Sequence, residues 1–371
     1  MNFDYSDDQK FLKNEARKFL EARCTSAAVR KVLDNADVSF DADLWKGVAE
    51  QGWLGAAIPE EFGGLGLGHI ELCAIAEEMG RVVAPIPFAS TVFFVAEAIL
   101  LAGDDAQKAD LLPKIAAGEL IGCFATSEGP GVVNASNLSA RVEGGKLTGV
   151  KIPVTDGDIA DLAIVLANEG GKAGLFLVDL KGAGVSRDTL QSLDPTRGVG
   201  RLTFAGAPAT RLGAAGDGFT LTEQVFDRAA VLLAFEQTGG ADKCLEMARE
   251  YALGRYAFGR VIAGYQAIKH KLADMYVKNQ VARSNAYYGA WALNTNAPEL
   301  PVAASAARIA ASEAYWFGSK ENIQTHGGMG FTWEVDCHLY YRRSRQLGLV
   351  AGAPKVWKER LVSQLERKNA A

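Results

Sequence analysis

The chain has 371 residues, of which 49% are hydrophobic, and its 39 basic and 44 acidic side chains leave a formal net charge of −5. This composition can bury more than one core and carries no general basic footprint, so we expect two or three domains and no nucleic-acid partner. No apolar run reaches membrane-spanning length, so we expect no membrane partner either.

The amino-terminal stretch and the cysteines indicate the cellular compartment of the protein. The opening residues are acidic and amphipathic and resemble neither a signal peptide nor an Arg/Ser-rich transit peptide. The cysteines are scattered at spacings that fit no zinc site, which favours reduced thiols in a cytoplasmic protein. They are Cys24, Cys73, Cys123, Cys244 and Cys337.

Residues 1–120 are predicted to form a helical domain. Ser6, followed by Asp7 and Asp8, is typical of an N-cap with a dipole-matched first turn. The next residues place an apolar stripe on one helix face, namely Phe11, Leu12, Ala16, Phe19 and Leu20. A Pro/Gly-rich loop is expected over 58–69, and further helices over 69–85 and 91–120, with ends at Pro85, Gly103 and Gly118.

Residues 121–217 are predicted to form a β domain, and residues 218–371 a second helical domain. Short β-branched runs alternate with turns in the middle part, and Gly144-Gly145 lies between two alternating runs, as in a hairpin. In the last part a helical stripe is expected to contain Ile268, Leu272, Met275 and Tyr276. The fold class is therefore α+β, with the order helical, β, helical.

The stretch GRYAFGRVIAGYQAIKHKLADM (254–275) places an arginine, an aromatic residue and Gly259 before a helix that has Gln266 in its first turns. Arg255 could bind a phosphate through charge-assisted, bidentate hydrogen bonds. The alternative is an ordinary salt bridge beside a turn.

The stretch ENIQTHGGMGF (321–331) contains Gly327 and Gly328, which permit positive φ and close backbone approach. Successive backbone N–H groups could form an anion-binding nest, and Gln324 could add a side-chain amide. The alternative is a glycine-rich helix end and turn.

A third stretch, CFATSEGPG (123–131), leads from the helical region into the β domain. Thr126, Ser127 and Glu128 offer small hydrogen-bonding groups that suit the polar edge of a ring. The alternative is an ordinary loop with a helix-cap signature.

Together these stretches resemble the acyl-CoA dehydrogenase family over nearly the whole chain. The most specific part is Arg-x-x-Phe-Gly followed by Gln266 and Leu-Ala-Asp-Met, with a later Gln-x-x-Gly-Gly-x-Gly. The segments WLGAAIPEEFGGLGLG and LDPTRGVGRLTF also look like family segments. The resemblance implies a helical N-terminal domain, a middle β domain, a C-terminal four-helix bundle, bound FAD and a tetramer built as a dimer of dimers.

The resemblance also implies two groups of cofactor-binding residues. One group would hold the adenosine and pyrophosphate end of a neighbouring subunit's FAD, and it consists of Arg255, Phe258, Gln266, Gln324, Gly327 and Gly328. The other lies in the segments FATSE and IPVTDG, which in the family lie against the flavin ring, and it consists of Phe124, Thr126, Ser127 and Thr155. Ser127 and Thr155 match positions that hydrogen-bond to the isoalloxazine.

The catalytic residue of the family is absent from both of its usual places. Family enzymes abstract the α-proton of an acyl-CoA thioester with a glutamate, and the two matching positions are Gly352 and Ala229. Asp227 and Glu236 are weak candidates for a displaced base, because two residues turn about 200° along a helix and Glu236 is about two turns away. The ordinary interpretation of both is a solvated or capping carboxylate, although in the family an aspartate matching Asp227 lies near the CoA pantetheine.

Two further departures affect the same region. The family tryptophan that packs on the flavin corresponds to Pro153, and the segment GPGVVN lacks the usual Ser-Asp. The cofactor-contacting residues therefore match the family better than the substrate chemistry does.

Four hypotheses follow. The chain could be the base-lacking subunit of an α2β2 heterotetramer with a homologous partner, or a self-sufficient homotetramer with a displaced base. Otherwise it could be a flavin-dependent oxidase, monooxygenase or nitro-compound enzyme, or a non-catalytic scaffold. We expect an acyl-CoA thioester as substrate and an electron-transfer flavoprotein as electron acceptor, whereas the shape of the acyl group is not apparent from the residues.

Overall fold

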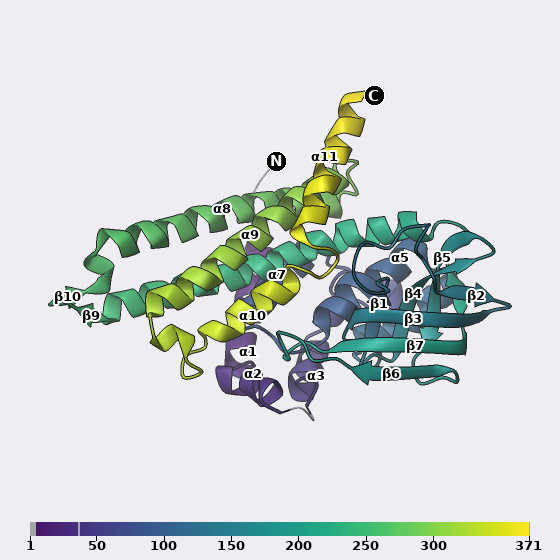
Figure 1. Ribbon diagram of the computed structural model, residues 1–371, viewed down its shortest axis with the longest axis horizontal. Helices are drawn as coiled ribbons and strands as arrows, with labels where there is room; N and C mark the ends of the chain where they lie inside the picture. Colours follow the sequence, from purple (N-terminus) through teal and green to yellow (C-terminus); the bar gives the residue numbers. More distant parts are fainter. Residues whose placement is uncertain (1–4, 36–37, 371) are drawn as a thin grey trace. The chain divides into compact units, whose positions relative to one another are not determined.

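The computed structural model describes residues 5–35 and 38–370, and these divide into two compact units (Figure 1). Of these residues, the first unit contains 5–29, 69–84 and 230–370, and the second contains 30–35, 38–68 and 85–229. Two helices, α2 (Ser26–Leu33) and α7 (Gly218–Gly254), have residues in both units.

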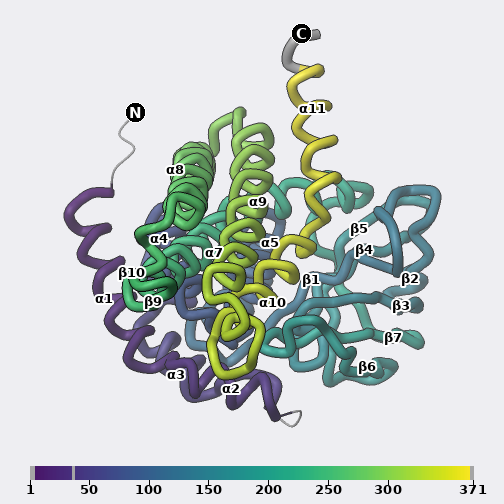
Figure 2. Tube along the Cα trace, turned by 60° about the vertical axis from the view of Figure 1, so that its left-hand side comes forward, coloured from purple at the N-terminus to yellow at the C-terminus, as the bar shows by residue number. Residues whose placement is uncertain are grey.

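The first unit is helical. Its helices are α1 (Asp7–Arg23), α4 (His69–Arg81), most of α7, α8 (Gln266–Asn294), α9 (Leu300–His326), α10 (Cys337–Leu347) and α11 (Pro354–Ala370). The long helices α8 and α9 lie side by side, and α10 and α11 pack against α9 (Figure 2).

Close backbone contact joins α4 to α7 within this unit. A Cβ atom on Gly80 would lie 1.8 Å from the carbonyl oxygen of Glu236, and one on Gly239 would lie 1.9 Å from that of Glu77. Neither position can hold a side chain without separating the helices.

The predicted N-cap of α1 is confirmed. Gln9 N donates to Ser6 Oγ at 3.2 Å, and Ser6 N donates to Gln9 Oε1 at 2.9 Å, which forms a capping box. The predicted stripes are only partly correct: Ala16, Leu20 and Met275 are buried, whereas Phe11 and Tyr276 are exposed. Helix α4 ends at Arg81, four residues before the predicted stop at Pro85.

The second unit contains one eight-stranded sheet and short helices. The strands are β1 (Gly122–Ala125), β2 (Arg141–Glu143), β3 (Lys146–Thr155), β4 (Leu162–Glu169), β5 (Lys172–Asp179), β6 (Val185–Thr189), β7 (Val199–Pro208) and β8 (Thr210–Leu212). Their order is β6-β7-β3-β2-β4-β5-β8, and β1 pairs with β4 in parallel. The helices are α3 (Ala42–Glu50), the 3₁₀ turns η1 (Trp53–Gly55) and η2 (Glu60–Phe62), the π-helix η3 (Ala89–Ala96), α5 (Glu97–Ala102) and α6 (Asp105–Ala116).

The predicted hairpin is confirmed in this sheet. Strands β2 and β3 pair as antiparallel neighbours around Gly144 and Gly145, whose φ angles are 56° and 73°. Two consecutive positive φ angles are typical of a type I′ turn, which glycine adopts freely. The predicted ends of α5 at Gly103 and of α6 near Gly118 also agree with the structure.

The predicted α+β fold, with helical N- and C-terminal parts and a sheet between them, is confirmed. The domain limits at residues 120 and 217 stay a prediction. None of the helices in the described ranges combines the length and hydropathy that a membrane span requires.

Candidate cofactor site

A short connector between α7 and α8 carries two of the predicted cofactor residues and leads directly to a third. After α7 ends at Gly254, strands β9 (Tyr256–Ala257) and β10 (Arg260–Val261) form a two-residue hairpin, followed by the 3₁₀ turn η4 (Ile262–Gly264). Phe258 and Gly259 form its turn with φ angles of 52° and 79°, and Phe258 is 98% exposed. Gln266 is the first residue of α8. Positive φ is unusual for a bulky residue. At Phe258 this conformation presents the phenyl ring to the outside.

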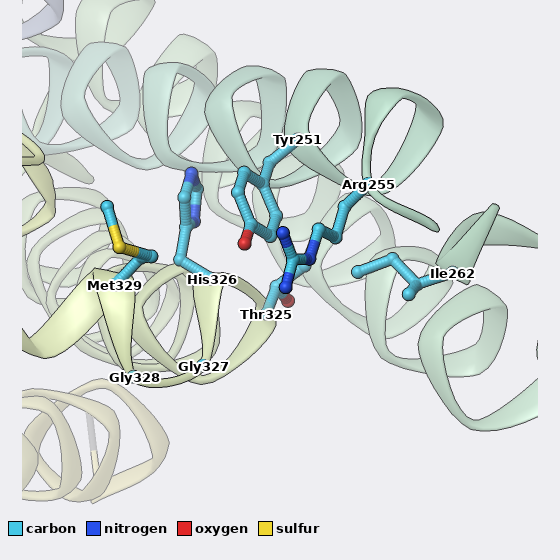
Figure 3. Close-up of a pocket in the computed structure, with 8 residues that line it drawn as sticks. All are labelled: Tyr251, Arg255, Ile262, Thr325, His326, Gly327, Gly328 and Met329. Carbon is cyan, nitrogen blue, oxygen red and sulfur yellow. The ribbon is translucent and has the colours of Figure 1, made fainter. Parts of the chain in front are cut away.

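Arg255 lies at one wall of an open pocket of about 490 Å³ in the first unit (Figure 3). The α7–α8 side of the pocket contributes Tyr251, Arg255 and Ile262, and the end of α9 contributes Thr325, His326, Gly327, Gly328 and Met329. Among the described residues, no ion pair of Arg255 is seen. Its exposed guanidinium is available to an anion.

The glycines opposite Arg255 leave backbone open to the same pocket. Gly327 is the C-cap of α9 with φ 61° and ψ −138°, a conformation that essentially only glycine adopts. A Cβ atom built on Gly327 or Gly328 would meet no atom within 4 Å, so a side chain there would project into open space. An arginine facing exposed backbone of this kind fits the phosphates of a dinucleotide.

Tyr251 and His326 meet across the pocket, one from each wall, and the sequence analysis did not single out either residue. Their rings stack with centroids 4.2 Å apart, and the ring Nδ1 of His326 lies 2.9 Å from the carbonyl oxygen of Asn322. Burial lowers the pKa of His326, so the imidazole is neutral at neutral pH and the positive charge of the pocket comes from Arg255. Tyr251 lies one helical turn before Arg255, a spacing that could have identified it.

The structure therefore brings together three of the six residues predicted for the adenosine and pyrophosphate end, namely Arg255, Gly327 and Gly328. Phe258, Gln266 and Gln324 are exposed close by in sequence but do not line the pocket.

The residues predicted for the flavin ring lie in the second unit, where β1 leads into an irregular segment beside β3. Phe124 on β1 contacts Phe94 and Phe226, with ring centroids 6.1 and 6.0 Å away. The carbonyl oxygen of Ser127 accepts a hydrogen bond of 2.9 Å from Ile152 N, and Ser127 Oγ donates to the carbonyl oxygen of Gly129. Segment 126–128 is thus attached to β3, three residues before Thr155.

A buried ion pair reinforces this attachment. Lys151 is fully buried, and its Nζ lies 2.7 Å from Glu128 Oε1 and 3.2 Å from the carbonyl oxygen of Thr126. The carboxylate of Glu128 also accepts hydrogen bonds from Ser139 and from Ala140 N. Burial alone would raise the pKa of Glu128, but the hydrogen bonds from Lys151 and Ser139 lower it to about 2. Glu128 joins strands instead of capping a helix, so the helix-cap alternative for this stretch is wrong.

Neither of the two positions predicted for a catalytic base carries a carboxylate. Gly352 lies in the turn between α10 and α11 at φ 107°, where an L side chain is strained, and a Cβ atom there would be 3.6 Å from Trp357 Nε1. The fully buried Arg308 holds this turn by donating hydrogen bonds to the carbonyl oxygens of Leu347 and Val350. Ala229 is completely buried in α7.

The two weak candidates for a displaced base are buried, so their interpretation as solvated or capping carboxylates is wrong. Asp227 and Glu236 are each 4% exposed, and both lie inside α7. Glu236 Oε1 lies 3.4 Å from Nη1 of the buried Arg343, an ion pair that accounts for the burial of this carboxylate.

Two family models match the chain: "Acyl-CoA dehydrogenase, N-terminal domain" over residues 6–119, and "Acyl-CoA dehydrogenase, C-terminal domain" over residues 216–365. A similar relative is "Acyl-CoA dehydrogenase IpdE2" of Mycobacterium tuberculosis, 32% identical over 97% of this chain and 98% of the relative. Among solved structures, a variant of the Tcur3481-Tcur3483 steroid ACAD is 30% identical with a TM-score of 0.90, and the match covers 98% of this chain and 99% of that one. The ChsE4-ChsE5 complex from Mycobacterium tuberculosis is 25% identical with a TM-score of 0.90, and the match covers 99% of both chains.

Proposed function

Because this chain belongs to the acyl-CoA dehydrogenase family, we propose that it is the base-lacking subunit of an FAD-dependent acyl-CoA dehydrogenase made of two homologous chains. One observation carries the proposal: the pocket of Arg255, Gly327 and Gly328 is formed, whereas both base positions hold residues without a carboxylate, Gly352 and Ala229.

The residues of the first unit would hold the phosphates of FAD. Arg255 would pair with a phosphate oxygen, and the open backbone at Gly327 and Gly328 would let the dinucleotide approach closely. The neutral His326 beside them leaves Arg255 as the cation of the pocket. Following the family pattern, this FAD would belong mostly to the neighbouring subunit.

The residues of the second unit would contact the ring of another FAD, the one held mostly by this chain itself. Ser127 and Thr155 offer hydroxyl groups to it, on segments that Lys151 and Glu128 hold together. The bound flavin would supply the redox chemistry by accepting a hydride from the β-carbon of the acyl group. The protein must orient the thioester and remove its α-proton, and that proton needs a base within hydrogen-bond reach.

A homologous partner would supply that base. Two solved neighbours support a two-chain assembly, since their names each join two components, and one of them is described as a steroid ACAD. We propose a bulky, ring-containing acyl-CoA thioester as substrate and an electron-transfer flavoprotein as acceptor.

The test is the flavin content and oligomer mass of the chain, purified alone and co-expressed with a homologous chain that carries the glutamate. We expect less than one FAD per chain when it is alone, and a loaded α2β2 tetramer that oxidises an acyl-CoA when the partner is present. Full flavin content together with ordinary acyl-CoA oxidation by the chain alone would refute the two-chain proposal. In that case Asp227→Asn and Glu236→Gln variants would test for a displaced base, and dioxygen consumption would test for an oxidase.

A further inference from the structure

A buried charged cluster lies directly behind Thr155 in the second unit. Asp156 is 1% exposed and its Oδ2 accepts a hydrogen bond of 2.6 Å from Ser90 Oγ. The same oxygen lies 3.1 Å from Nη2 of Arg197, which is 4% exposed. The cluster joins the π-helix η3, the end of β3 and the loop before β7.

The backbone around Asp156 is held as tightly as its side chain. Asp156 has φ 55°, a left-handed conformation that costs a non-glycine residue energy unless its surroundings enforce it. Its N–H donates to the carbonyl oxygen of Gly198 at 2.8 Å, and Thr155 pairs with Val199 in the antiparallel ladder. A Cβ atom on Gly200 would lie 2.6 Å from Asp158 N, so the turn after Thr155 packs directly on β7.

Two titratable side chains, Cys123 and Asp158, lie close enough to Asp156 for its charge to affect their pKa. Burial and the charge of Asp156 raise the pKa of both Cys123 and Asp158. The guanidinium of Arg197 lies in contact with the carboxylate of Asp156. Replacing such a buried pair with apolar side chains is often neutral or stabilising, so its presence is better explained by the geometry it imposes than by stability.

We propose that Asp156, held by Ser90 and Arg197, is a positioning residue that fixes Thr155 for its hydrogen bond to the flavin ring and thereby sets the reduction equilibrium of the flavin. This inference rests on the proposed function, in which Thr155 contacts the isoalloxazine. Asp156 acts through Thr155 and does not itself touch the cofactor.

The experiment compares the reduction midpoint of the FAD-loaded protein, equilibrated with a reference dye, among matched variants of the full chain with its partner. Thr155→Val removes the hydroxyl at nearly constant shape, and we expect it to shift the reduction equilibrium about tenfold, or about 30 mV for a two-electron couple. Asp156→Asn and Ser90→Ala should shift it in the same direction by at least threefold. Arg141→Gln, on the exposed face of the same sheet, should leave it unchanged.

Non-additivity separates positioning from a general structural effect. If Asp156 acts through Thr155, the Asp156→Asn/Thr155→Val double variant should shift the equilibrium no further than Thr155→Val alone. A shift that adds fully, or an Asp156→Asn protein whose midpoint equals that of the unmodified protein, would overturn the inference. Should Asp156→Asn not fold, Ser90→Ala, which removes only the hydroxyl that contacts Asp156 and the carbonyl oxygen of Pro87, decides the question by the same criteria. A protein that takes up no FAD with or without its partner would overturn the proposed function as well, so the two failures are distinguishable.

Discussion

Replacing Lys151 with methionine would test the buried ion pair that holds segment 126–128 to β3. The substitution keeps most of the side-chain volume and leaves the carboxylate of Glu128 without its cation. Removing one partner of a buried pair costs about 3–5 kcal/mol. Glu128 is slightly exposed and keeps its hydrogen bonds from Ser139 and Ala140, so we expect the lower end, about 3 kcal/mol, or roughly a 100-fold increase in local opening.

Native-state hydrogen exchange of peptides from β1 and β3 would measure this opening. The control is Lys146→Met on the exposed side of the same strand, which should change exchange by no more than about 0.5 kcal/mol. A Lys151→Met/Glu128→Gln double variant should recover part of the loss, because no charge then remains buried. Equal exchange in the two lysine variants would refute the reasoning.

The same pair predicts a dependence on pH. The pKa of Glu128 is about 2 in the folded chain, below its usual value of 4.5, so its contribution to stability is present above pH 4.5. That contribution is lost as the pH falls from 4.5 to about 2. The protection factors of the β1 and β3 peptides, which correct for the pH dependence of intrinsic amide exchange, should therefore fall over this window in the unmodified protein, and less so in Lys151→Met. An identical fall in both proteins would contradict this origin.

Three further predictions concern the first unit. Gly352→Ala should lower the free energy of unfolding by about 1–3 kcal/mol in thermal unfolding, because residue 352 has φ 107°. The control Gly348→Ala, at φ −63°, should be nearly neutral. Equal effects of the two substitutions would exclude backbone strain as the cause. Arg255→Gln should weaken FAD binding about 10- to 100-fold in equilibrium titration, and Arg260→Gln should not; unchanged binding would remove Arg255 from the cofactor site. Arg308→Met should make the turn of residues 348–353 more sensitive to protease, because the carbonyl groups of Leu347 and Val350 lose their hydrogen-bond donor. Unchanged resistance to protease would show that Arg308 does not stabilise this turn.

Local signals in the sequence predicted the features that depend on a few neighbouring residues. The capping box at Ser6 and the Gly144-Gly145 hairpin follow from side chains within three positions of one another. Arg255 and Gly327 were singled out because both lie in recognisable motifs, although 72 positions separate them; the structure places them in one pocket, and their cofactor-binding role stays a prediction.

Features that depend on tertiary contacts could not be predicted in this way. Helical periodicity marks an apolar stripe but does not say how far the neighbouring helices cover it, which is why Phe11 and Tyr276 are exposed. Glu236 is buried because Arg343, distant in sequence, pairs with it, and no local pattern signals that partner. Strand β6 has four exposed residues out of five, so it lacks the alternation that would have revealed it.

Buried ion pairs occur in both units, and two of those in the second unit suit its predicted contact with the flavin ring. Two ion pairs, Lys151–Glu128 and Asp156–Arg197, are buried beside the two segments predicted to contact the flavin ring. Buried pairs contribute little net stability compared with apolar packing, but they fix the position of the backbone that carries them. A scaffold would need only the fold, which an apolar interior provides. Placing such pairs next to Ser127 and Thr155 is what a site requires when two hydroxyl groups must be held in one geometry.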